Sequence, residues 1–204
     1  MPTAPGFVRT AAAAVIALAV GLIAVPTQAQ PAVAEAATVF TIADGAIALD
    51  APAGWQRVQP KSGIVETEFA IPSEGAAADG AALAPGRMTV MGAGGSVEAN
   101  IERWYGQFAQ PDGSSTKDKS AVKKLKVAGR DVTLVDIAGT YKDSPGGPFA
   151  GGQTIERPGY RMLAAIVEGP DGNYFLKFYG PAATVEKHAD GFWKMVEGMV
   201  PATK

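Results

Sequence analysis

The residues in this chain that could do chemistry are few, and the first group is a polar triplet within the segment 96–109. Asn100, Arg103 and Gln107 recur at helical spacing and flank Trp104, so a helix would place them on one stripe. The guanidinium fork of Arg103 suits anionic groups, and the triplet could therefore bind an anionic or sugar-like ligand. The alternative is the solvated side of an amphipathic helix.

A carboxylate provides the second candidate. Asp136 interrupts the apolar run 132–137, and a carboxylate in such a strand is costly to bury unless it is paired. It could act as a general base with a perturbed pKa. Equally, it could face solvent or pair with Arg161 or Lys177 on a neighbouring strand.

Glu66 and Glu68 form the third candidate because they point the same way on a strand of alternating polarity. They could imitate the two carboxylates of a glycosidase, or they could be two exposed strand carboxylates. The sole histidine, His188, borders an apolar helical stripe and has no Gly-x-Ser-x-Gly partner motif, which favours a structural or surface role.

The segment from Lys142 to Gly159 is rich in glycine and proline and separates two expected strands. Loops of this length inside compact domains are usually functional or disordered. Phe149 is its only aromatic residue before Tyr160 and could cap a pocket or contact a partner. A lysine-rich stretch, 117–126, could protect an edge strand from aggregation or recognise an acidic partner.

Composition excludes several classes of function. The chain has 204 residues, 18 basic and 20 acidic side chains, and a net charge of −2, so nothing in its overall charge attracts nucleic acid or an anionic membrane. It has no cysteine and one histidine, which excludes thiol catalysis, zinc–thiolate sites and sites that need two histidines. We therefore predict no catalytic residues, no metal and no cofactor.

The N-terminal residues predict export. Arg9 precedes the apolar run 11–25, Pro26 ends that run, and Thr27-Gln28-Ala29 offers the small residues of a cleavage site. The run is shorter than the roughly 20 residues of a membrane span. We expect residues 1–29 to be a signal peptide cleaved after Ala29, 30–37 a flexible leader, and the mature protein to be secreted or periplasmic with no membrane span.

Hydrophobic periodicity and turn residues organise residues 38–204 into one expected α+β domain. Two helices are expected, from Ser96 to Ala109 and from Pro181 to about Val200. The expected strands are 39–42, 47–49, 64–71, 87–91, 121–127, 131–141, 160–168 and 173–179. Strand 160–168 is apolar on both faces, which predicts a central strand covered on both sides. The pattern predicts a largely antiparallel sheet of six to eight strands with two main helices packed on it.

Three short segments add a family resemblance: 52–55 (Pro-Ala-Gly-Trp), 69–72 (Phe-Ala-Ile-Pro) and the closing Phe192…Met195-Val196. With the order of elements from Val39 to Val200, they resemble the Mog1/PsbP-like group of exported α/β/α sandwich domains. The resemblance implies a non-catalytic binding or accessory domain and no catalytic residues.

Three functions remain open at this point. The first is a non-catalytic exported binding or accessory domain that recognises an unknown protein or small ligand in the envelope or exterior, with a site framed by the polar triplet and the 142–159 loop. The second is a carboxylate-dependent hydrolase of the cell envelope built on Asp136 or on the Glu66/Glu68 pair. The third is a small envelope-structural protein with a contiguous apolar patch.

Overall fold

The computed structural model describes residues 1, 38–73, 75–76, 80–144 and 153–202. The expected cleavage site, the leader and Phe149 lie outside these residues. Every helix and strand described belongs to the unit Ala34–Lys204. Within the described ranges, no helix is long and apolar enough to cross a membrane.

The described elements are eleven strands, two α-helices and one 3-10 helix. In chain order they are β1 (Thr38–Ile42), β2 (Ile47–Ala51), β3 (Gln56–Val58), β4 (Thr67–Ile71), β5 (Gly86–Ala93), α1 (Val97–Gly106), β6 (Phe108–Ala109), η1 (Lys117–Lys119), β7 (Ala121–Val127), β8 (Arg130–Asp143), β9 (Ile155–Gly169), β10 (Gly172–Pro181), α2 (Ala182–Glu197) and β11 (Val200–Pro201).

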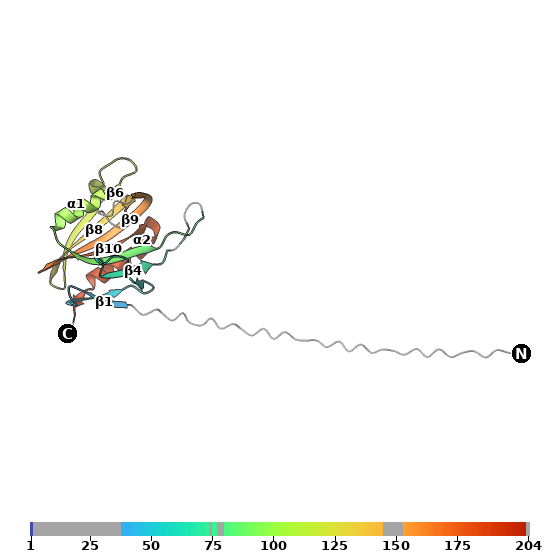
Figure 1. Ribbon diagram of the computed structural model, residues 1–204, viewed down its shortest axis with the longest axis horizontal. Helices are drawn as coiled ribbons and strands as arrows, with labels where there is room; N and C mark the ends of the chain where they lie inside the picture. The colour runs from blue at the N-terminus through green and yellow to red at the C-terminus, as the bar shows by residue number, and fades with distance from the viewer. Residues whose placement is uncertain (2–37, 74, 77–79, 145–152, 203–204) are drawn as a thin grey trace. The chain divides into compact units, whose positions relative to one another are not determined.

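The strands form two antiparallel sheets. The large sheet has eight strands in the order β3-β4-β5-β10-β9-β8-β6, with β7 also paired to β8, and Figure 1 shows its long strands with α1 beside them. This confirms the expected α+β class with a sheet of six to eight strands and two main helices. The small sheet, β1-β2-β11, was not expected, because it depends on Val200 and Pro201 pairing with Ala48 and Ile47 far away in sequence.

The hairpin of β9 and β10 lies at the centre of the large sheet, as predicted. Residues 162–167 are all completely buried. Alternate side chains contact different cores: Leu163 and Ala165 pack in the cluster that contains α2, and Ala164 and Ile166 pack in the cluster that contains α1. Since the side chains of a strand alternate between faces, the two helices cover opposite faces of the sheet.

Helix α1 begins where the sequence predicts but ends earlier. The Ser96 hydroxyl accepts the Ala99 N–H at 3.1 Å and caps the helix. The expected continuation to Ala109 is wrong, because Phe108 and Ala109 leave the helix and pair as β6 with Tyr141 and Thr140 of β8. This pairing holds the C-terminal end of α1 against the sheet.

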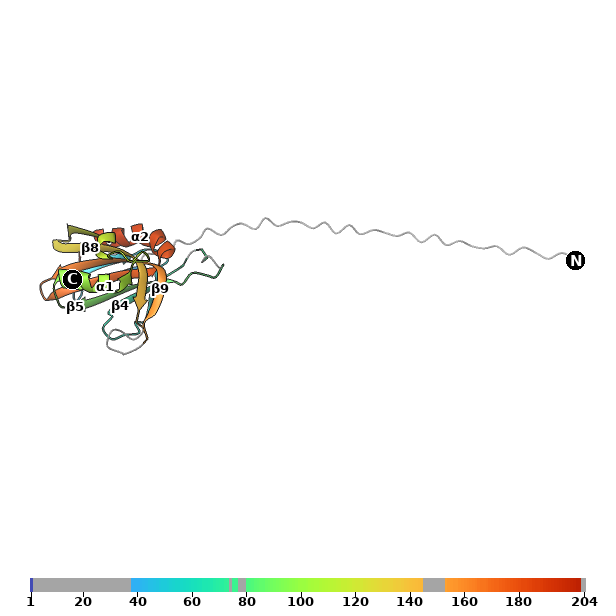
Figure 2. The same cartoon turned by 90° about the horizontal axis from the view of Figure 1, so that it is seen from above.

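The expected loop from Lys142 to Gly159 is shorter than predicted. Strand β8 continues to Asp143 and β9 begins at Ile155, with Tyr141 opposite Arg157 and an Arg157–Asp143 ion pair at 2.8 Å. The paired ends of the two strands can be followed in Figure 2. Glycine and proline content suggested a loop here, but cross-strand pairing extends the hairpin.

Candidate functional site

The face of the large sheet that carries α1 is apolar over part of its area and polar over the rest. Helix α1 covers the apolar part with Val97, Ile101 and Trp104, which pack with Ile166 and Phe175. Beyond that contact the same face continues into charged and aromatic residues of β4, β5 and β10. We define the polar face by six residues: Glu68, Arg87, Arg103, Gln107, Lys177 and Tyr179.

Strand register brings the sheet residues of the polar face together. Lys177 pairs with Thr89, and Tyr179 pairs with Arg87 on the neighbouring strand. Thr89 in turn lies opposite Glu68 of β4. Paired residues of adjacent strands point to the same side of a sheet, so these side chains form a continuous row across three strands.

Lys177 is the central cation of the polar face. Its Nζ donates to the side-chain Oε1 of Gln107 at 3.2 Å and lies 5.4 Å from the ring centroid of Trp104 and 6.0 Å from that of Tyr179. Burial, followed by the positive charges of Arg103 and Arg87, lowers the pKa of Lys177 to about 8. Lys177 is therefore a half-buried ammonium whose charged neighbours are cations.

Arg87 neutralises the one carboxylate of the polar face. Its Nε and Nη2 each donate to a Glu68 oxygen at 2.7 Å, and Nη1 donates to the Tyr179 hydroxyl. The hydrogen bonds from Arg87 lower the pKa of Glu68. The expectation that Glu68 is exposed is wrong, because its side chain is only 7% exposed and this fork compensates its burial.

Tyrosines extend the polar face toward the ends of β8 and β9. The Tyr141 ring lies 5.4 Å from that of Tyr179 and stacks on Tyr160 at 6.1 Å with 12° between the planes. Burial raises the pKa of both Tyr141 and Tyr179, so their hydroxyls stay protonated at neutral pH. The result is a cluster of three tyrosine rings beside Arg87, which donates to the Tyr179 hydroxyl.

The three residues of the predicted triplet lie on α1 and just after it, and each makes different contacts. Asn100 is 2% exposed, and its amide donates to the carbonyl oxygens of Gly94 and Ser96. Its Oδ1 accepts a hydrogen bond from Arg103 Nη2 at 2.6 Å. Asn100 thus fixes Arg103, which is exposed, while Gln107 contacts Lys177.

Asp136 lies elsewhere and is paired, as one of the sequence interpretations had it. Both of its oxygens accept hydrogen bonds from Arg161, at 2.9 and 2.7 Å. The other suggested partner, Lys177, lies on the opposite side of the sheet, because Asp136 pairs with Leu163 and Leu163 with Phe178, next to Lys177. Asp136 lines a groove of about 260 Å³ between β7, β8 and α2.

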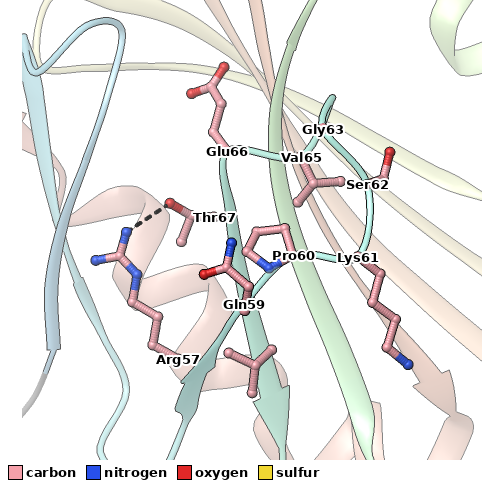
Figure 3. A pocket seen from close by; sticks show the side chains of 10 residues that line it. Arg57, Gln59, Pro60, Lys61, Ser62, Gly63, Val65, Glu66 and Thr67 are labelled. Atoms are coloured by element: carbon pink, nitrogen blue, oxygen red, sulfur yellow. Dashed lines mark hydrogen bonds between the residues drawn. The ribbon is translucent and has the colours of Figure 1, made fainter.

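A larger cavity, of about 520 Å³, lies within the connection between β3 and β4. Its lining residues all come from the segment 57–67, with Ile64 left out, and Arg57 donates to the Thr67 hydroxyl at 3.3 Å (Figure 3). Figure 3 shows the charged groups of Lys61 and Glu66 at opposite ends of this lining. Ligand sites usually have polar groups that converge, so we prefer the polar face as the candidate site.

His188 occupies a structural position. The Trp55 indole N–H donates to its Nδ1 at 3.3 Å, and its Nε2 lies 3.2 Å from the Pro72 carbonyl oxygen. Burial lowers its pKa, and the neutral form with a proton on Nε2 satisfies both contacts. In the described part of the chain, His, Asp and Glu side chains form no group of three or more that could hold a metal ion.

The lysine-rich stretch 117–126 includes β7, whose only partner strand in the described sheet is β8. Two of its lysines make short ion pairs: Lys117 with Glu102 and Lys126 with Asp131, both at 2.6 Å. Edge protection and recognition of an acidic partner both remain predictions for this stretch.

Sequence reasoning missed Arg87 and Tyr179 and assigned Lys177 only as a partner for Asp136. A signal was present: Phe175, Lys177 and Tyr179 alternate with apolar residues, so a period of two would have placed the cation on one face of a central strand. The link to Arg87 needs the pairing of β5 with β10, which no local pattern reveals.

No family model and no curated protein matches this sequence. Several solved structures are similar to this chain, among them the following three. A protein of unknown function from Pseudomonas aeruginosa is 12% identical, with 83% of this chain and 99% of that one covered and a TM-score of 0.45. Cyanobacterial PsbP (CyanoP) from Synechocystis sp. PCC 6803 is 10% identical, with 86% and 99% covered and a TM-score of 0.47. The Ran-binding protein Mog1p of Saccharomyces cerevisiae is 12% identical, with 82% and 96% covered and a TM-score of 0.46. The last two bear the names of the group that the sequence resembles.

Proposed function

We propose that this chain is a non-catalytic exported binding domain that recognises a protein or small ligand at the polar face. The observation that carries the proposal is Lys177, a half-buried cation between aromatic rings whose charged neighbours, Arg103 and Arg87, are also cations. Holding like charges together is unfavourable in the free protein. Such an arrangement is useful where a ligand supplies the missing negative charge.

The hydrolase interpretation is less well supported, because the carboxylates on which it depends already have hydrogen-bond partners. Asp136 and Glu68 are each held by an arginine fork, and Glu66 accepts the backbone N–H of Gly92 at 3.0 Å. The envelope-structural interpretation needs a contiguous apolar patch. Among the described residues, Val39 and Val200 share one side of the small sheet, and the other large exposed apolar residues of the domain, Ile64, Val122 and Ile155, lie on three separate segments. Strand pairing therefore brings no more than two of them together.

The proposal of export rests on the N-terminal pattern of charge, apolar run and small residues. N-terminal sequencing of the protein recovered from the periplasm or medium tests it. We expect the mature chain to begin at Gln30. Recovery of an uncleaved chain from the cytoplasm alone would contradict export.

Amide chemical shifts of the purified protein test binding at the polar face. Benzoate, inorganic phosphate, glucose and an acidic peptide would be titrated separately, and a chromogenic ester and a chromogenic glycoside would be assayed for hydrolysis. We expect shifts centred on β5, β10 and the end of α1, with both chromogenic probes intact. Chemical-shift changes confined to the β3–β4 cavity or to the β7–α2 groove would show that the ligand binds there and not at the polar face. Hydrolysis of either chromogenic probe would refute a non-catalytic function.

A further inference from the structure

We propose that Lys177 and Arg103 bind an anionic oxygen group, a carboxylate or a phosphate, as the recognition element of the ligand. The inference rests on the proposed binding function and names the chemistry of its site. The anion would take over the contact that the Gln107 side chain makes with the Lys177 ammonium in the free protein.

The balance of charges on the polar face favours an anion. Its one carboxylate, Glu68, has both oxygens engaged by Arg87. Lys177 and Arg103 therefore have uncharged hydrogen-bond acceptors in the described structure, the side-chain oxygens of Gln107 and Asn100. Two cations without a carboxylate leave a local positive charge that an external anion would neutralise.

The Arg103 guanidinium and the Lys177 ammonium are each positioned by a neighbouring side chain and keep N–H groups that can still donate to a ligand. Arg103 donates to the Asn100 side-chain oxygen at 2.6 Å, which holds the guanidinium in place. That contact uses one of the five N–H groups of the guanidinium. The ammonium of Lys177 uses one of its three N–H groups on Gln107. The rings of Trp104 and Tyr179 fix its position and keep water from surrounding it, which strengthens a charge–charge contact.

Binding of an anion should draw a proton onto Lys177. The groups that face this ammonium are Arg103 on α1, Arg87 on β5, and the neutral side chains of Gln107 and Tyr179. Both charged neighbours favour the neutral amine, and a bound anion acts in the opposite direction. At pH 8 about half of the Lys177 side chains are neutral, so binding should take up as much as about half a proton per ligand.

Isothermal titration calorimetry measures affinity and proton uptake together. The protein would be titrated at pH 8 and pH 6 with benzoate, inorganic phosphate and an acidic peptide, in two buffers of different ionisation enthalpy. The first two probes represent a small ligand, and the peptide represents an acidic side chain of a protein partner. We expect benzoate or the acidic peptide, whose carboxylates stay ionised over this range, to bind with proton uptake at pH 8 and almost none at pH 6. Phosphate changes its own ionisation between these pH values and therefore reports affinity only.

Four variants separate the role of Lys177 from a general effect of charge. Lys177→Met should weaken binding about tenfold and abolish the uptake, whereas Lys177→Arg should stay within about threefold and also show no uptake, since arginine does not titrate here. Arg103→Gln should weaken binding by a smaller factor. Lys123→Met removes an exposed lysine of β7 and should change neither quantity. Circular dichroism checks that each variant is folded.

The outcomes distinguish this inference from the proposed function. Anion binding that Lys177→Met and Arg103→Gln leave unchanged, or no binding of any anionic probe, overturns the anion site. If glucose or the peptide still shifts the amides of the polar face in Lys177→Met, the binding function stands without the anion site. Uptake lost in Lys177→Met together with hydrolysis of a chromogenic probe supports the anion site and refutes the non-catalytic function.

Discussion

The two faces of the large sheet are covered to different extents. Helix α2 has 16 residues and, together with β1 and β2, covers most of its face, where Phe69, Met88, Leu163, Leu176 and Phe178 are completely buried. Helix α1 has 10 residues and leaves the row of Arg87, Lys177 and Tyr179 half-buried at its C-terminal end. The shorter helix thus leaves part of the central sheet accessible to solvent.

This difference separates stability from binding. Burial of apolar area is the main favourable contribution to folding, and most of the large apolar side chains gather on the α2 face. Charged groups on the α1 face contribute little net stability once their desolvation is counted. A binding surface can therefore vary on one face while the other face holds the fold.

The largest expected effect is on the α2 face. Phe178 is completely buried and its ring lies 5.3 Å from that of Trp55 and 6.0 Å from that of Phe192. Phe178→Ala should lower the free energy of unfolding by about 3–5 kcal/mol, because it leaves a cavity. Tyr179→Phe, one residue away on the other face, should cost about 1 kcal/mol. Urea denaturation measures both, and equal losses would contradict the division of the faces.

The sequence predicted the elements of the α2 face because local patterns specify them. The alternation in Phe69 and Ile71 and the doubly apolar strand 160–168 identify strands from neighbouring residues alone. Ser96 likewise marks the start of α1 through its capping hydroxyl. These features arise within a few residues of each other, so one sequence suffices to find them.

The polar face was harder to predict because it depends on contacts between distant residues. Glu68 and Arg87 are 19 residues apart, and Gln107 and Lys177 are 70 residues apart. The early end of α1 also depends on β6 pairing with β8. Such contacts depend on the register between strands. An alternating pattern predicts which face of the sheet a residue lies on, but it does not predict which residues of the adjacent strands lie beside it.

The second prediction weakens the polar face itself. Glu68→Gln removes the charge that holds Arg87 and should lower the free energy of unfolding by about 2 kcal/mol at pH 7. This figure is below that for a fully buried pair, because the Arg87 side chain is 38% exposed and partly solvated. Glu66→Gln, an exposed residue of the same segment, should cost less than about 0.5 kcal/mol.

The same two variants should also differ in how their free energy of unfolding depends on pH. Since Arg87 lowers the pKa of Glu68 in the folded state, the stabilisation is complete above the ordinary value of 4.5 and is lost as pH falls through the lowered value. Unfolding measured from pH 7 to pH 3 should therefore be less pH-dependent in Glu68→Gln than in Glu66→Gln. Identical pH profiles would show that the Arg87 fork adds nothing.

The third prediction removes a buried hydroxyl group without a hydrogen-bond partner from the α2 face. Thr184 at the start of α2 is completely buried, and its hydroxyl has no hydrogen-bond partner among the described residues. Thr184→Val keeps the shape, removes the unsatisfied group and should raise the free energy of unfolding by about 1 kcal/mol. Thr67→Val is the matched control, since its buried hydroxyl accepts from Arg57, and it should be destabilising. A loss in both variants would contradict this account.

The smallest expected effect lies at the margin of the α2 face, where His188 joins Trp55 to Pro72. Burial lowers the His188 pKa, so the folded state favours the neutral ring and its stabilisation is complete above the ordinary value of 6.5. As pH falls below that value, the unfolded chain takes up a proton first and stability decreases, by less than about 1 kcal/mol. The positive charge of Lys187 acts in the same direction.

His188→Gln isolates this effect, because a glutamine can accept from the Trp55 indole and donate to the Pro72 carbonyl without titrating. Urea denaturation at pH 7.5 should give nearly equal stability for the variant and the natural protein. At pH 5.5 the natural protein should be the less stable of the two. If both lose the same stability on acidification, the carboxylates account for the pH dependence and His188 contributes only its packing.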